Sequence, residues 1–372
     1  MDREKKFLLD PYGDWCAGEG IPVIGGLGVD LLAIETGSWP RLGEKCKGAI
    51  VNMEGRGDYM SIFVYDLPPA AATAPQRHLF DEVFYVLSGH GTMTVEMAGG
   101  GTHTFEWGPR SMFAPPINAR YRIFNASGAE PARLASGNAM PFIYNFFRDE
   151  RFVFDNPHTF GDREGPGTYF EGEGKFTEVR QGRHMWETNF VPDLSDFELK
   201  PWENRGAGSS NMQFILADGS MGAHVSEMPV GTYKKGHRHG PGLHVFFVHG
   251  TGYTLLWNMD DEDFKRVDWR HGVVFAPPRD MFHQHFDTSA QPARYLAIGF
   301  GTKRYPIIYD RRAGSENNRS DVSIKLGGRQ IEYDDQDPRI HRIWLEEIRK
   351  TGVKSQLGKY FDEAAIEREL GW

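Results

Sequence analysis

Cysteine and long apolar runs are both scarce in this 372-residue sequence, and each absence narrows the class of protein. Two cysteines, Cys16 and Cys46, cannot form a disulfide framework, so a cytoplasmic location is predicted. No run approaches the roughly 18 apolar residues of a transmembrane helix, and no membrane partner is expected. An apolar stretch followed by a small-residue cleavage site is missing from the first residues, so no secretory signal is expected.

A block of positive charge is also missing. The chain has 42 Lys and Arg against 51 Asp and Glu, which gives a formal net charge of −9. Because binding to a phosphate backbone depends on clustered basic side chains, nucleic acid is not an expected partner. The apolar content of 40% and the charged content of 25% are typical of a soluble globular protein with one large or two ordinary domains.

Helical periodicity is absent from about residue 58 to residue 138. Short runs rich in β-branched and aromatic residues occur there instead, and each is bounded by Gly, Pro or Asn. The whole chain contains 26 Phe, 14 Tyr, 44 Gly and 22 Pro, as many short strands joined by turns would require. An all-β fold is predicted.

The series of short runs occurs twice, which predicts a tandem duplication. Residues 107–116 (WGPRSMFAPP) match residues 269–278 (WRHGVVFAPP) at an offset of 162 positions. Residues 82–86 (EVFYV) align with residues 244–248 (HVFFV) at the same offset. Agreement at one offset across separate segments is not expected by chance.

Histidine is concentrated in the second copy, where eight of the 14 histidines lie between His224 and His285. His237 and His239 are two residues apart, so on a β-strand both imidazoles point to one face, as a chelating pair requires. His283 follows 44 residues after His239 and could close the site from a neighbouring strand. The alternative is a surface histidine cluster in a loop, which the apolar, strand-like flanking runs disfavour.

Both copies resemble the two motifs of the cupin superfamily. The matching residues are Gly231, His237, His239, Gly250, Gly272, Pro278, His283 and Asp287 in the second copy, and His78, Glu82, Gly89, Pro116 and Asn125 in the first. The resemblance implies a bicupin, with two tandem jelly-roll β-barrels and a metal site in the mouth of a barrel. It also implies that His237, His239 and His283 are the metal ligands.

The first copy has Gln76 and Tyr121 where this resemblance expects histidine ligands, which leaves only His78 and Glu82. Two such ligands rarely hold a catalytic metal, so the first barrel is predicted to be structural. The chain is then divided into an N-terminal cupin domain (1–145), a connecting segment (146–205), a C-terminal cupin domain with the metal site (206–310) and a tail with helices (311–372).

The tail has clear helix boundaries. Asp337 and Pro338 form a start, and Gly352 forms an end, with a second, shorter helix expected over residues 361–370. The tail helices would either cover a barrel or contact a second subunit, and a homo-oligomer is expected.

One further position bears on the chemistry, because most cupins carry a glutamate ligand there. Counting forward from His239 reaches His244, whereas counting back from Gly250 reaches Leu243. Strand parity favours His244, because in the proposed alignment it lies on the face used by Glu82. His244 is therefore expected to point inward.

Three roles stay open for His244: a fourth ligand, a base that contacts a ligand, or an ordinary hydrogen-bonded barrel histidine. His285 is a second catalytic candidate, because on a regular strand it shares the face of His283. Other possible substrate contacts, for each of which a packing or surface role is the simpler explanation, are Tyr233, Lys234, Trp257, Arg279, Arg294 and Arg304.

Three neutral imidazoles would leave a divalent ion its full charge and open positions, which favours a small anionic substrate followed by O₂. The runs His-Arg-His at 237–239 and His-Gln-His at 283–285 look like those of gentisate 1,2-dioxygenase and its relatives, which are bicupins of about this length. The resemblance implies Fe(II) and cleavage of a hydroxylated aromatic acid, although Mn, Ni or Zn also suits imidazole. In those enzymes the best metal site is in the N-terminal cupin, so substrate identity is not transferred.

Two other classes remain open. One is a redox-neutral, metal-dependent decarboxylase, lyase or isomerase. The other is a non-catalytic bicupin that binds a small molecule, which the complete histidine triad of the second copy disfavours.

Overall fold

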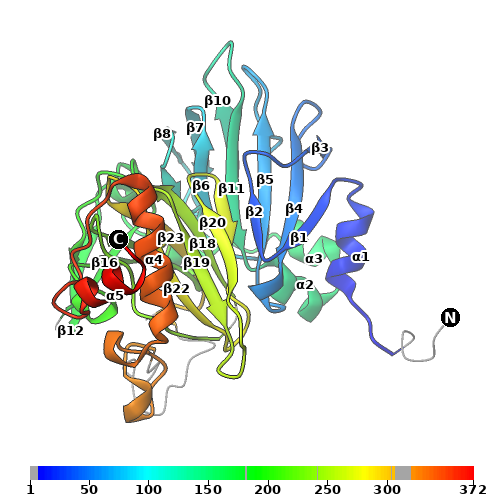
Figure 1. Ribbon diagram of the computed structural model, residues 1–372. Coiled ribbons are helices and arrows are strands. Elements are labelled where there is room, and N and C mark those ends of the chain that lie inside the picture. The colour runs from blue at the N-terminus through cyan, green and yellow to red at the C-terminus, as the bar shows by residue number, and fades with distance from the viewer. Residues whose placement is uncertain (1–6, 181, 241, 303, 306–319) are drawn as a thin grey trace.

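The computed structural model describes residues 7–180, 182–240, 242–302, 304–305 and 320–372 (Figure 1). Two β units of matching topology follow one another along the chain, coloured blue to cyan and green to yellow in Figure 1, with a few short helices. The predicted all-β, bicupin fold class is confirmed. Among the described residues no helix is both long and apolar enough to span a bilayer.

In the first barrel, a large sheet of order β1-β4-β5-β11-β6-β9-β14, with β3 beside β4, accompanies a three-stranded sheet of order β10-β7-β8. The strands are β1 (Val23–Gly26), β3 (Gly37–Ser38), β4 (Lys47–Met53), β5 (Ser61–Leu67), β6 (Glu82–Ser88), β7 (Gly91–Glu96), β8 (Thr102–Trp107), β9 (Met112–Phe113), β10 (Arg120–Asn125), β11 (Ala132–Asn138) and β14 (Phe190–Val191). Three helices lie at one end of this barrel, namely α1 (Pro11–Gly18), α2 (Met140–Phe147) and α3 (Glu150–Phe154).

The second barrel repeats this plan. Its large sheet has the order β12-β13-β16-β17-β23-β18-β21-β2, with β15 beside β16, and its small sheet has the order β20-β19-β22. The strands are β2 (Gly28–Asp30), β12 (Lys175–Arg180), β13 (Arg183–Thr188), β15 (Lys200–Pro201), β16 (Ser210–Leu216), β17 (Met221–Met228), β18 (Leu243–His249), β19 (Gly252–Trp257), β20 (Lys265–Trp269), β21 (Val273–Phe275), β22 (Phe282–Asp287) and β23 (Ala293–Phe300).

Strand pairing fixes how the two copies align, and it corrects one predicted match. Glu82 lies opposite Asn138 in the first barrel, and Leu243 lies opposite Gly299 in the second. Leu243 follows Glu82 by 161 positions, and Gly299 follows Asn138 by the same number. The offset of 162 predicted for β6 and β18 is therefore wrong by one residue. A one-residue shift moves a side chain to the other face of a strand, so Leu243, and not His244, occupies the position of Glu82.

The barrels exchange short strands. Strand β2, from the predicted N-terminal domain, pairs with β21 of the second barrel, and β14, from the predicted connecting segment, pairs with β9 of the first. The connecting segment is thus ordered as part of both barrels. The predicted boundary between residues 310 and 311 lies outside the described residues, within 306–319.

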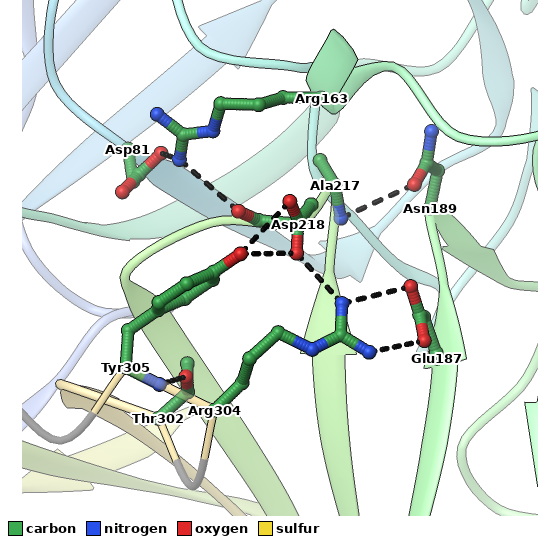
Figure 2. Close-up of polar contacts among 9 residues, drawn as sticks. All are labelled: Asp81, Arg163, Glu187, Asn189, Ala217, Asp218, Thr302, Arg304 and Tyr305. Atoms are coloured by element: carbon green, nitrogen blue, oxygen red, sulfur yellow. Dashed lines mark hydrogen bonds and ion pairs between the residues drawn. The ribbon is translucent and has the colours of Figure 1, made fainter.

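A cluster of ion pairs also links the two barrels (Figure 2). An Arg163 guanidinium nitrogen lies 3.6 Å from the Asp81 carboxylate of the first barrel and donates to the backbone oxygen of Asp218 in the second at 3.1 Å. Arg304 donates to both Glu187 oxygens, at 3.0 and 2.5 Å, and to the Asp218 carboxylate at 2.7 Å. Arg304 therefore has a structural role, in agreement with the simpler of its two predicted roles.

The C-terminal helices cover the second barrel. Helix α4 (Pro338–Thr351) begins where the Asp337 side chain accepts a hydrogen bond from the Arg339 backbone N–H at 2.8 Å, and ends at Gly352 with a φ of 73°. Trp344 of α4 is fully buried and donates from Nε1 to the Asp287 carbonyl of β22 at 2.9 Å. Helix α5 (Glu363–Glu369) follows. Both predicted tail helices are confirmed, and α4 packs on its own chain.

Asp287 occupies the position that Asn125 has in the first copy. The Asn125 Nδ2 donates to three backbone carbonyls at 2.8–3.0 Å. The buried Asp287 carboxyl accepts two bonds from Ser289 at Oδ1, whereas its Oδ2 has no partner among the described residues. Burial raises the pKa of Asp287 to about 7, because the charged form loses its hydration.

We expect Asp287→Asn to stabilise the fold, and to do so more strongly at pH 8 than at pH 5. The pKa in the folded state lies above the unfolded value, so the contribution of Asp287 is most favourable below about pH 4 and is lost as the pH rises through about 7. A difference of three pKa units corresponds to roughly 4 kcal/mol. Urea unfolding at both pH values tests this, and a variant that is no more stable than the wild type at pH 8 would contradict it.

Candidate metal centre

The three histidines predicted as metal ligands converge in the second barrel. His237 and His239 lie on the segment before β18, and His283 lies on β22. His237 and His283 are paired as an isolated bridge, with backbone N–H···O distances of 3.0 and 2.9 Å. One ring nitrogen from each of the three histidines lies within 4.8 Å of the other two. This spacing suits a single metal ion held by three imidazoles.

Backbone carbonyls determine which ring nitrogen of each histidine is free to bind. The Nδ1 atoms of His237, His239 and His283 lie 3.1, 2.8 and 3.3 Å from carbonyl oxygens of neighbouring residues. Because a carbonyl only accepts hydrogen bonds, each Nδ1 carries the proton and each Nε2 keeps its lone pair. Burial lowers the pKa of His239 to about 4 and the pKa values of His237 and His283 well below the usual range. All three are neutral at pH 7, which is the form that binds a metal.

A closed hydrogen-bond network fills the corresponding region of the first barrel. The Glu82 carboxylate accepts from Tyr65 at 2.5 Å, from Ser136 at 2.5 Å and from Tyr121 at 2.8 Å, and it lies 2.9 Å from the His78 Nε2. All five side chains are buried. The carboxylate is thus saturated by protein donors, which supports the prediction that this barrel has a structural role.

In the second barrel, side chains that are smaller or that cannot hydrogen-bond replace part of this network, and a cavity lies beside them. At the same offset of 161, the counterparts are Ser226 for Tyr65, Leu243 for Glu82 and Ala297 for Ser136. All three counterparts line a cavity of about 120 Å³, together with the three convergent histidines.

Positive charge lines this cavity, and no Asp or Glu is among its described lining residues. Arg205, which is only 6% exposed, reaches it from the 3₁₀ turn Glu203–Arg205. The Arg205 guanidinium donates to the Ser320 carbonyl at 2.6 Å and to the Gln330 Oε1 at 3.1 Å, and within the described chain it has no carboxylate in ion-pair distance. Burial lowers the pKa of Arg205 to about 10, so it remains charged at neutral pH. The cavity therefore favours an anion.

Sequence reasoning missed Arg205. It lies more than 30 positions before His237, in the predicted connecting segment, and follows no motif. Only the folding of that segment against the second barrel reveals it.

His285 lies beside the three convergent histidines, as predicted. It is 2% exposed and lines the cavity, and its ring centre is 5.6 Å from that of His283 and 6.2 Å from that of His237. Its Nδ1 lies 2.9 Å from the Thr254 hydroxyl rather than near a carbonyl. His285 is not part of the convergent group.

His244 does not reach this centre, so its predicted inward orientation is wrong. Leu243 and Val245 line the cavity, and the alternation of a β-strand directs His244 to the opposite face. His244 is fully buried near the first barrel, where the N–H of Gly242, two residues earlier, donates to the Gly55 carbonyl at 3.1 Å. Neither ring nitrogen of His244 has a partner among the described residues, and burial lowers its pKa to about 3. It is a neutral core side chain without the predicted hydrogen bond.

Arg294 has the structural role that its repeat counterpart indicated. Its Nε donates to the Glu227 carboxylate at 2.8 Å, as the Arg133 Nε donates to Asp66 at 2.6 Å in the first barrel. The same ion pair therefore occurs once in each copy.

Comparison with known proteins adds no family assignment. No protein-family model and no curated protein matches the sequence. Among solved structures, one of Bacillus subtilis oxalate decarboxylase, described with Mn(II) centres, has a TM-score of 0.47 and 15% identity, over 75% of this chain and 78% of that chain. Another, at pH 4.6, has the same TM-score and 14% identity, over 75% and 77%. A similarity of this size carries no information about the reaction of the present chain.

Proposed function

We propose that this protein is a divalent-metal-dependent enzyme that acts on a small organic acid. The observation that carries the proposal is the convergence of three neutral imidazoles beside a cavity that contains Arg205 and no described carboxylate. Neutral ligands leave the charge of a bound ion uncompensated, so an anion is the complementary ligand. When bound, such an ion supplies a Lewis acid that polarises the substrate.

The side chains around the cavity have separable roles in this proposal. Arg205 holds a substrate carboxylate through charge-assisted hydrogen bonds. Because the guanidinium is fixed in the cavity wall, these bonds also orient the substrate. Tyr295 also lines the cavity, and burial raises the pKa of its phenol, so it is protonated at neutral pH and able to donate. The burial of these groups keeps bulk water from the substrate.

Cavity size favours a small aliphatic acid over an aromatic one. The reaction that we propose for such an acid is redox-neutral, for example decarboxylation, elimination or isomerisation. A cavity of about 150 Å³ is what benzene occupies, and the cavity here is about 120 Å³. A substituted aromatic acid would have to enlarge it. Mn(II), Fe(II), Ni(II) and Zn(II) all suit three imidazoles, so we leave the metal open among them.

The second candidate is an Fe(II)-dependent dioxygenase that uses O₂ to cleave a hydroxylated acid. The absence of a carboxylate at the Leu243 position favours it, because three neutral ligands leave positions for both a bidentate anion and O₂. It requires the cavity walls to move apart for an aromatic substrate.

The two candidates differ in their need for O₂. Protein purified without oxygen and loaded with Mn(II) or Fe(II) is incubated anaerobically with a panel of small hydroxy, keto and dicarboxylic acids. We expect turnover without O₂, seen either as released CO₂ or as an isomer or elimination product of the acid. Turnover only in air would establish the dioxygenase. Failure of the wild-type protein to retain any divalent metal would overturn both.

Leu243→Glu should restore a fourth ligand at the position where the first barrel has Glu82. We expect tighter metal retention, by about tenfold or more, and weaker binding of an anionic substrate, because the added carboxylate compensates the charge of the ion. Competition with a chromophoric chelator measures the first effect. Leu243→Gln is the matched control, and an equal effect of both substitutions would contradict the prediction.

A further inference from the structure

Three buried side chains form a hydrogen-bonded chain that ends at the cavity. The Trp269 Nε1 donates to the Thr254 hydroxyl oxygen at 3.2 Å, and the same oxygen lies 2.9 Å from the His285 Nδ1. Trp269 and Thr254 belong to β20 and β19, and His285 belongs to the adjacent β22. The three side chains are 3%, 0% and 2% exposed, so water does not compete for these bonds.

The direction of these bonds sets the tautomer of His285. An indole N–H can only donate, so the Thr254 oxygen accepts from Trp269. The hydroxyl hydrogen of Thr254 has no other acceptor among the described residues, so it is donated to the His285 Nδ1. The Nδ1 of the neutral ring therefore carries the lone pair, and Nε2 carries the proton.

The proton of His285 is thus on the other ring nitrogen from that of its three histidine neighbours. The Nδ1 atoms of His237, His239 and His283 face carbonyls, which leaves each Nε2 as a ligand. His285 lines the same cavity, and its Nε2 has no protein partner in the described part of the chain. A protonated Nε2 cannot bind a metal, but it can donate to an anion.

The first barrel provides an internal control. Met93 and Ile123 form the cross-strand pair that corresponds to Thr254 and His285. Trp107 corresponds to Trp269, yet its buried Nε1 has no partner among the described residues. The tryptophan therefore does not need this bond for packing, and within the described residues the polar chain occurs only in the barrel with the three convergent histidines.

We propose that His285 is a hydrogen-bond donor to the anionic ligand of the metal centre, and that Thr254 and Trp269 are positioning residues that hold it in the Nε2–H tautomer. This inference rests on the proposed function, because it requires a metal and an anion in the cavity. It assigns His285 as a residue that contacts substrate and is not a fourth metal ligand.

The tautomer can be read directly by nuclear magnetic resonance of the Zn(II)-loaded protein with ¹⁵N-labelled histidine. We expect a protonated Nε2 on His285 in the wild type and in Thr254→Ser, and a shift toward the Nδ1–H form in Thr254→Val, which has no hydroxyl. A wild-type His285 protonated at Nδ1, or no change in Thr254→Val, would overturn the inference.

Anion binding separates this inference from the proposed function. Co(II)-loaded protein is titrated with acetate, and the visible spectrum of the metal reports binding. His285→Phe should retain Co(II) but bind acetate about tenfold more weakly, the effect of one hydrogen bond to a charged group. His285→Gln, whose amide also donates, should recover part of the affinity.

The outcomes are distinct. If the wild-type protein fails to bind Co(II), the proposed function fails. If Co(II) binds but acetate affinity is unchanged in His285→Phe, only the role of His285 fails. If His285→Phe folds and loses Co(II), His285 is a ligand and the inference is overturned.

Discussion

Replacing His283 by alanine is expected to remove the metal and, with it, activity. His283 contributes one of three convergent ring nitrogens, and its backbone pairs with His237, so the remaining pair is left as a two-ligand site. Loss of an outer partner of a metal ligand already costs about 10–100-fold in metal affinity or activity, and loss of the ligand itself should exceed that range. Metal content after gel filtration, together with turnover of the loaded protein, measures both effects.

The matched control is His244→Leu, which removes a buried histidine of the same barrel that makes no hydrogen bond to the described residues. Metal content should be unchanged in this variant. Loss of metal there, with retention in His283→Ala, would contradict the assignment of the centre and restore an inward role for His244.

Replacing Arg205 by methionine is expected to weaken substrate binding by about 10–100-fold without loss of metal. Hydrogen bonds to a charged group are worth roughly 1.5–3 kcal/mol, and the guanidinium is a buried cation, beside Arg183, in a cavity whose described lining has no carboxylate. Methionine keeps much of the side-chain volume and removes the charge. Titration of the Co(II)-loaded variant with acetate and oxalate, followed by the metal spectrum, gives the change in affinity.

Arg205 also donates to Ser320 and Gln330, so a purely structural role must be tested separately. Arg205→Lys keeps the charge, and we expect it to recover part of the anion affinity. Arg304→Met breaks the ion pairs of Arg304 with Glu187 and Asp218 outside the cavity, and it should leave anion affinity unchanged. Equal losses in Arg205→Met and Arg304→Met would show that the effect is a general disturbance of the barrel.

The fold and the three convergent histidines were predictable because their signals are local or repeated. The duplication was visible in short aligned runs. The spacing of two residues between His237 and His239 was predicted for a strand, and the pair instead lies on the segment before β18, where His237 forms an isolated bridge. The boundaries of α4 follow from Asp337 and Gly352, whose capping roles need no tertiary context.

The sequence left two candidate positions for the missing glutamate, Leu243 and His244, because the choice between them depends on a register set by distant strands. The two copies are offset by 161 at Gly91 and Gly252, but by 162 at Trp107 and Trp269. The extra residue of the second copy therefore lies within the β19–β20 hairpin, after the position that corresponds to Glu82. In the sequence, Gly89 and Gly250 already differ by 161 positions, but only the pairing of β18 with β23 decides between this count and the count forward from His239. The error of one residue in the predicted offset assigned His244 to the position that Leu243 occupies in the structure.

Neither the role of Arg205 nor the exchange of strands between the barrels could be predicted from the sequence, and both for the same reason. Both arise where a segment packs against a barrel distant in sequence, and two- or three-residue strands such as β2 and β14 have too little pattern to be recognised.

The crossing of β2 and β14 between sheets makes the two barrels mutually dependent for folding. Each short strand covers backbone N–H and C=O groups on β21 or β9 of the other barrel. A chain cut between the barrels would expose those edges, which are templates for intermolecular pairing and aggregation. Although it arose by duplication, the molecule is expected to unfold as one cooperative unit. The first barrel, whose Glu82 is saturated by protein donors, then contributes to the stability of the barrel with the three convergent histidines.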